Sequence, residues 1–107
     1  MKINTTKNNL FLALNEANKV IPIRTTLPIL GCVLLEAKEN KLQITATDLE
    51  QTISTTITAK TIKPGKIALS AGRFLEIVSA LPDTQIEISS LEDYKTEINS
   101  PQGVYNI

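Results

Sequence analysis

The stretch that decides the fold runs from Arg24 to Glu50. It begins with Arg24-Thr-Thr-Leu-Pro-Ile-Leu-Gly31, continues through the apolar run Cys32-Val-Leu-Leu-Glu-Ala37 and ends on Thr47-Asp-Leu-Glu50. Proline lacks an amide hydrogen and pushes the preceding residue toward extended geometry, so the proline in the first part excludes a helix there. The stretch therefore predicts a constrained loop, two strands and a polar corner, and it carries no hallmark of catalysis.

Three consecutive strands are predicted across this stretch and just beyond it. Cys32–Lys38 is apolar at nearly every position, which is typical of a strand covered on both faces. Leu42, Ile44 and Ala46 alternate with polar residues, as in a strand with one buried face. Gln51–Ala59 is rich in threonine and isoleucine, which favour strands. Together they indicate an antiparallel meander.

A helix is predicted upstream from apolar residues that recur every three or four positions. Its buried stripe consists of Leu10, Leu14, Ala17 and Ile21. Thr5 or Thr6 can cap the first free amides of this helix with a hydroxyl group. The opposite face is mostly polar and only lightly charged, and it carries Asn8, Leu12, Asn15, Glu16 and Lys19.

The same order of elements restarts after the turn signal Lys63-Pro-Gly-Lys66. A strand at 66–69 leads to Ser70 as the expected helix cap, and a second helix stops at Pro82. The buried stripe of this helix consists of Phe74, Ile77, Val78 and Leu81. Three further strands are predicted at Thr84–Ser89, Tyr94–Ile98 and Val104–Ile107.

A shift of 64 positions superposes the two halves of the chain and places Lys2 on Lys66 and Thr6 on Ser70. Strand, cap and helix stripe all align under this shift, which is typical of an internal repeat. We therefore predict an α+β fold of two strand-helix-three-strand repeats, about 1–59 and 66–107, with both helices on one side of antiparallel sheet. The loop that carries Arg24 is an insertion in the first repeat, and such loops are a common place for function.

Composition limits the possible function classes. The chain has 107 residues, eleven basic against eleven acidic side chains, no histidine and one cysteine. This length favours a single domain, and the missing histidine removes the usual general base and the commonest metal ligand. No apolar run has the length of a signal peptide or a membrane span. We expect a cytoplasmic protein without membrane contact, cofactor or metal.

Several of these motifs resemble a known family. The run Arg24–Gly31, the Thr47-Asp-Leu-Glu50 corner and the helix start Ser70-Ala-Gly-Arg-Phe74 are similar to the N-terminal domain of the bacterial DNA polymerase III sliding clamp, the beta subunit. The resemblance covers essentially all 107 residues, in order and with similar spacing. The spacing of the first two motifs is its most specific part.

The resemblance implies the DNA-clamp fold and a non-catalytic processivity role. Clamps of this family are head-to-tail homodimeric rings that encircle duplex DNA of any sequence and tether the polymerase. Polymerase III and the clamp loader are then partners of the full-length protein. Residues 1–107 would supply only the first clamp domain, with the later domains absent. The chain stops at Ile107 inside a predicted strand, as a cut domain does.

The resemblance also implies site residues. Arg24 and Arg73 match positions where the family carries basic residues near the central hole, and Lys19 is a further DNA-contact candidate. A guanidinium group suits phosphate oxygens. Each alternative stays open: Arg24 and Lys19 can be solvated surface charges, and Arg73 can pair with Glu76 or meet a partner subunit.

For the subunit interface, the resemblance points to Tyr105 and Ile107 on an edge strand, with Phe74 near it. The sequence departs from the family just before the aromatic residue, where Gln102 and Val104 replace basic residues. This departure puts the charged part of the interface in doubt. Tyr105 can also be a core residue.

Two other function classes stay open. An enzyme would rest on Asp48 and Glu50 as paired carboxylates, with or without a divalent metal between them. Acids at this spacing on a strand corner are usually turn or capping groups, and the sequence offers no third ligand. The other class is a non-catalytic α+β oligomerisation module that does not bind DNA.

Overall fold

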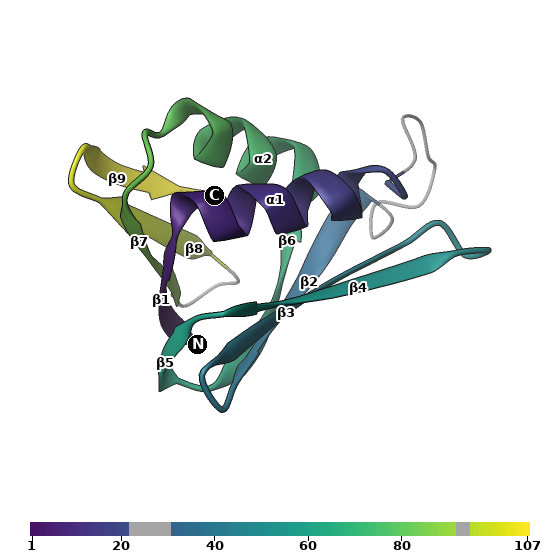
Figure 1. Ribbon diagram of the computed structural model, residues 1–107, viewed down its shortest axis with the longest axis horizontal. Coiled ribbons are helices and arrows are strands. Elements are labelled where there is room, and N and C mark those ends of the chain that lie inside the picture. The colour runs from purple at the N-terminus through teal and green to yellow at the C-terminus, as the bar shows by residue number, and fades with distance from the viewer. Residues whose placement is uncertain (22–30, 92–94) are drawn as a thin grey trace.

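The computed structural model describes residues 1–21, 31–91 and 95–107. In these residues the chain forms two helices and nine strands (Figure 1). In chain order they are β1 (Lys2–Thr6), α1 (Lys7–Asn18), β2 (Cys32–Lys38), β3 (Lys41–Thr47), β4 (Thr52–Thr58), β5 (Lys60–Lys63), β6 (Gly65–Ser70), α2 (Ala71–Ala80), β7 (Gln85–Ser90), β8 (Thr96–Ser100) and β9 (Gly103–Asn106).

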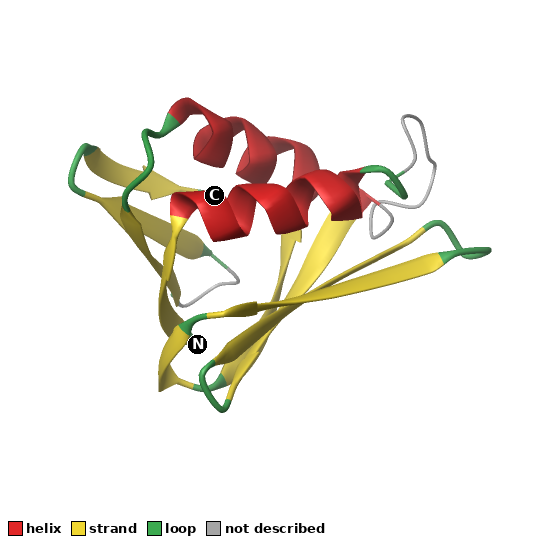
Figure 2. Ribbon diagram, viewed as in Figure 1, coloured by secondary structure: helices red, strands yellow, loops and turns green. Residues whose placement is uncertain are grey.

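The two helices lie next to each other on the same side of two antiparallel sheets, which confirms the predicted fold class (Figure 2). α1 packs against α2, β3 and β4, and α2 also contacts β2 and β6. One cluster of buried apolar side chains fills the space between helices and sheets. Both apolar helix stripes face this core, as helices of a layered domain require.

The two halves of the chain exchange their first strands. β1 joins the five-stranded sheet β5-β1-β7-β8-β9, and β6 joins the four-stranded sheet β4-β3-β2-β6. The registers correspond, because Ile3 lies opposite Ile88 while Ile67, its equivalent under the 64-residue shift, lies opposite Leu35. Each sheet therefore contains strands from both halves, and the halves share one core.

Burial follows the same shift along both helices. Leu10 and Leu14 of α1 are buried, and so are their equivalents Phe74 and Val78 in α2. Ala17 and its equivalent Leu81 are buried as well. This agreement supports the division into repeats; the repeat boundaries themselves stay a prediction.

The two cap predictions had different outcomes, and one strand was not predicted at all. Thr6 caps α1, because its Oγ1 accepts a hydrogen bond from the amide of Asn9 at 3.4 Å. Ser70 occupies the cap position of α2, but its side chain makes no capping hydrogen bond, so that part of the prediction is wrong. The strand β5 was not predicted; it pairs with β1, which is distant in sequence and invisible to local patterns.

No helix within residues 1–21, 31–91 and 95–107 is long and apolar enough to cross a membrane.

Candidate nucleic-acid interface

The outward face of α1 is rich in asparagine. Asn8, Leu12, Asn15 and Lys19 are exposed and follow one another at four, three and four residues, which places them on one stripe. Asn9, Glu16 and Asn18 flank this stripe and are exposed as well. We call the four residues of the stripe the α1 stripe; sequence periodicity predicted all of them on this face.

The outward face of α2 is the equivalent surface in the second half of the chain. Its exposed residues are Gly72, Arg73, Glu76, Ser79 and Ala80. Under the 64-residue shift, every one of these positions falls on an exposed position of α1. The two neighbouring helices therefore present equivalent faces to the same side of the molecule, away from both sheets (Figure 1).

Lys19 follows the last residue of α1 and is tied to the helix by an ion pair. Its Nζ lies 2.9 Å from Oε1 of Glu16, and both side chains are largely exposed. Exposed pairs of this kind contribute at most about 1 kcal/mol. A phosphate group could therefore replace Glu16 as the partner of Lys19. Sequence reasoning missed this pair, although the three-residue spacing on one helix face signals it.

Arg73 is exposed in the first turn of α2. Among the described residues it forms no ion pair, and the pair with Glu76 that the spacing allowed is not made. Its guanidinium is thus available to a ligand on the helix side. Arg24 lies outside the described residues, so its position relative to Arg73 and Lys19 stays a prediction.

The proposed interface residues lie in two different environments. Tyr105 and Ile107 are half-buried at β9, the last strand of the five-stranded sheet, and Ile107 continues the pairing through two hydrogen bonds with Thr96. Phe74, in contrast, is 0% exposed in the domain's own core. Its side chain has no surface to offer to a second subunit, so we leave it out of the interface proposed below.

The Thr47–Glu50 corner is a hydrogen-bonded turn between β3 and β4. Oδ1 of Asp48 accepts hydrogen bonds from the amides of Gln51 at 2.7 Å and Glu50 at 2.9 Å. Oγ1 of Thr47 accepts from the amide of Leu49 and donates to the carbonyl of Gln51. The Asp48 carboxylate thus closes the turn.

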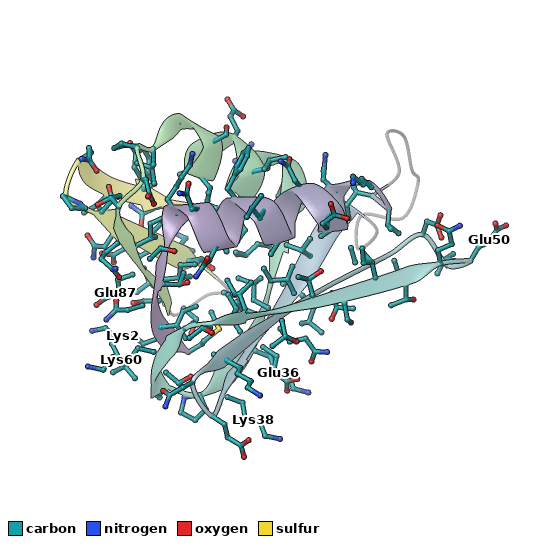
Figure 3. All side chains as sticks on the ribbon, viewed as in Figure 1. Lys2, Glu36, Lys38, Glu50, Lys60 and Glu87 are labelled. Atoms are coloured by element: carbon teal, nitrogen blue, oxygen red, sulfur yellow. The ribbon has the colours of Figure 1, made fainter. Side chains whose placement is uncertain are left out.

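Hydrogen bonds from the amides of Gln51 and then Glu50 lower the pKa of Asp48 below its ordinary value. The side chain of Glu50 points away from the domain at the tip of this hairpin (Figure 3), and the Asp48 carboxylate is bound to backbone amides of the turn. Among the residues with described positions, no group of three histidine, cysteine, aspartate or glutamate side chains could hold a metal. The hydrogen bonds of Asp48 agree with the turn role that the sequence suggested for acids at this corner.

Two adjacent helices on one side of two sheets, with the first strands exchanged between the halves, define the class of DNA clamp proteins. Residues 1–106 match the family described as DNA polymerase III beta subunit, N-terminal domain, and the chain belongs to this family.

Relatives and solved structures agree with this assignment. The chain is 32% identical over 108 residues to the beta sliding clamp of Vibrio cholerae, covering 100% of this chain and 30% of that protein. It is similar to Caulobacter crescentus pol III beta with a TM-score of 0.94 and 32% identity, covering 99% of this chain and 29% of that one. For the DNA polymerase sliding clamp from Bacillus subtilis the TM-score is 0.94 at 30% identity, over 99% of this chain and 30% of that one.

The chain thus spans about 30% of the length of the first of these relatives.

Proposed function

We propose that this chain acts as the N-terminal domain of a replicative sliding clamp, which encircles duplex DNA and confers processivity on DNA polymerase III without catalysing a reaction. The observation that carries this proposal is the family match over residues 1–106 together with the clamp architecture. The full-length protein has two further clamp domains after this one, and this domain consists of two repeats at about 1–59 and 66–107. It works in the cytoplasm, with the polymerase and the clamp loader as partners.

A closed ring holds DNA by enclosure, so its contacts with the duplex can be few. Sequence-independent phosphate contacts suffice, and tight binding would hinder sliding. The helix side of the domain fits this requirement, since Lys19 is weakly paired and Arg73 is available. We assign Arg24, Arg73 and Lys19 to the DNA contact.

The edges of the two sheets support head-to-tail assembly. Each sheet has one edge strand without any charged residue, β9 in the first and β4 in the second. Monomeric proteins usually protect such edges with lysine, as β5 does with Lys60 and Lys63. In a head-to-tail contact, one surface of a subunit binds a different surface of the next subunit, and a closed set of such contacts forms a ring. Two different uncharged edge strands suit this kind of contact. We assign Tyr105 and Ile107 of β9 to the contact with the partner subunit.

Primer extension on a primed single-stranded circle tests the processivity role. The full-length protein, added with clamp loader and polymerase III, should lengthen the products made in one binding event. Product lengths that do not change when the protein is added would contradict the proposal.

A non-DNA-binding oligomerisation module is the second candidate, and the low charge of the helix faces favours it. The two candidates differ in the effect of Arg24→Ala and Arg73→Ala on duplex affinity. A clamp domain with two or three phosphate contacts has a log-log salt slope of roughly −2 to −3, and each variant should make it shallower by about 0.9. A parent chain without measurable duplex affinity at low salt, and no change in either variant, would favour the module.

A further inference from the structure

The α1 stripe carries two side-chain amides that the fold itself does not use. Asn8 and Asn15 are exposed, and within the described part of the chain neither side chain hydrogen-bonds to another residue. The structural hydrogen bonds of asparagine side chains are made elsewhere, for example by Asn40, whose Oδ1 accepts from the amide of Thr61. Each free amide on α1 leaves two N–H donors directed to the outside.

The stability of α1 does not explain why its outward face carries asparagines. The twelve-residue helix KNNLFLALNEAN contains four asparagines, and one of them, Asn15, lies in the helix interior, where asparagine is a poor helix former. Alanine, lysine or glutamate at these exposed positions would favour the helix. The composition of the outward face therefore points to a ligand that needs donors.

The charges on this side of the domain narrow the choice of ligand. Glu16 is the only carboxylate on α1, and Lys19 compensates it at 2.9 Å. On α2 the position equivalent to Leu12 is Glu76, an exposed carboxylate without an ion pair among the described residues. A phosphate backbone is therefore repelled from the middle of α2 and tolerated along α1.

We propose that α1 contacts the phosphates of duplex DNA through the neutral amides of Asn8 and Asn15; this inference rests on the proposed clamp function and names a contact within it. Asparagine donates readily to phosphate oxygens. The two residues are seven positions apart, about 10 Å along the helix axis, so the stripe can touch more than one phosphate at a time. A neutral donor displaces no condensed counterion, so such a contact adds affinity without adding salt dependence.

The test compares three variants of the 107-residue chain, Asn8→Ala/Asn15→Ala, Arg73→Ala and Gln43→Ala, by titrating each with a short duplex at several salt concentrations. The double variant should raise Kd about five- to tenfold at every salt concentration and leave the log-log salt slope unchanged. Arg73→Ala should make the slope shallower by about 0.9. Gln43→Ala removes an exposed amide from the face of β3 turned away from the helices and should change neither quantity. Alanine favours the helix, so the double variant should melt no lower than the parent.

Side-chain amide signals give a second readout that also detects weak binding. In a ¹⁵N NMR titration of the parent chain with the duplex, the NH₂ signals of Asn8 and Asn15 should shift, and that of Gln43 should not. Shifts confined to Arg73 and Lys19, with unchanged affinity in the double variant, would overturn the amide contact and leave the clamp function standing. Shifts confined to the outer sheet faces, or no shift and no binding at low salt, would overturn the amide contact and count against the DNA contact as well.

Discussion

Thr96 is a polar residue buried in the hydrophobic core. Its side chain is 0% exposed, and its Oγ1 has no hydrogen-bond partner among the described residues. Leu35 and Ile88 are equivalent by strand pairing, because they lie opposite Ile67 and Ile3. Their partners in the next strand are Ile44 and Ile98. Thr96, two residues before Ile98, therefore takes the place that Leu42 has in the first half of the chain. A buried hydroxyl without a partner loses its hydration and gains nothing in return.

We expect Thr96→Val to raise the free energy of unfolding by about 1 kcal/mol, because valine keeps the shape and removes the unpaired hydroxyl. Thr5→Val is the matched control: Thr5 is also buried, but its Oγ1 donates to the carbonyl of Thr58 at 3.1 Å. The control should lower stability by a similar amount. Urea denaturation measures both, and a loss of stability in Thr96→Val would show that its hydroxyl is satisfied.

The carboxylate of Asp48 makes the free energy of unfolding depend on pH in the acid range. Its folded-state pKa is lowered below the ordinary value of 3.8, first by the amide of Gln51 and then by that of Glu50. A lowered pKa stabilises the fold above the ordinary value, and this contribution disappears as the pH falls through the lowered one.

We therefore expect Asp48→Asn, which keeps an acceptor oxygen but does not titrate, to lose less stability than the parent when the pH falls below about 4. Thermal melts from pH 6 downward measure this difference. Asp48→Ala, without any acceptor, should be less stable than the parent near neutral pH. Identical acid dependence in the parent and Asp48→Asn would contradict the role of this carboxylate.

The environment of a residue could be predicted from the sequence where it is formed by residues nearby in the chain. The Thr6 cap and the exposed α1 stripe follow from spacing along the chain and were predicted correctly. Ser70 has the right residue type and position for a cap, yet its hydroxyl does not bond the helix amides. The burial of Thr96, and the lack of a described partner for its hydroxyl group, result from tertiary packing. In the sequence, Thr96 looks like an ordinary strand residue.

Helix α1 holds Lys19 near Glu16, and this ion pair competes with a phosphate contact. We expect Glu16→Gln to free Lys19, lower the Kd for duplex DNA about two- to threefold and steepen the salt slope by up to about 0.9. Glu36→Gln, which breaks the 3.6 Å pair with Lys66 on the outer sheet face, makes the same charge change as a control. If both variants bind DNA equally tightly, Lys19 has no specific part in the contact.

Strand β9 is the element that the proposed ring uses for its subunit contact. We expect Tyr105→Ala in the full-length protein to raise the dimer dissociation constant at least about fivefold, because aromatic anchors dominate such contacts. Ile62→Ala, on the other edge strand of the same sheet, is the control. Analytical ultracentrifugation measures both, and an unchanged dimer in Tyr105→Ala would remove β9 from the interface.

The elements themselves were largely predictable, because most carry a clear period. Cys32–Lys38 was predicted with its observed bounds, but the prediction that both of its faces are covered is wrong, because Leu34 is 42% exposed. In the two helix stripes, Ile21 and Ile77 are half-buried, and the other six residues are buried as expected. The exception is β5, whose four residues Lys60–Lys63 have too few positions to show a period. Its partner β1 lies at the other end of the first half, so only the tertiary structure reveals the pairing.

In the molecule as a whole, charged side chains of both sheets lie on the faces turned away from the helices. Lys2 and Glu87 form a 3.6 Å pair on the outer face of one sheet, and Glu36 and Lys38 lie on the outer face of the other (Figure 3). Each helix carries one basic and one acidic residue, Lys7 and Glu16 on α1 and Arg73 and Glu76 on α2, and α1 adds four asparagines. This distribution and a net charge of zero suit a ring that must stay on DNA without gripping it. No pattern in the sequence shows enclosure, which in the proposed ring requires further domains and a second subunit.

Retention on circular DNA tests this enclosure most directly. The full-length protein is loaded onto a nicked circular duplex, separated from free protein, and the circle is then cut once. We predict that the protein stays on the circle at high salt and is released within minutes of linearisation, because a ring slides off a free end. Equal retention on the circular and the linear form would contradict the account, since it would mean that the protein holds DNA by affinity and not by topology.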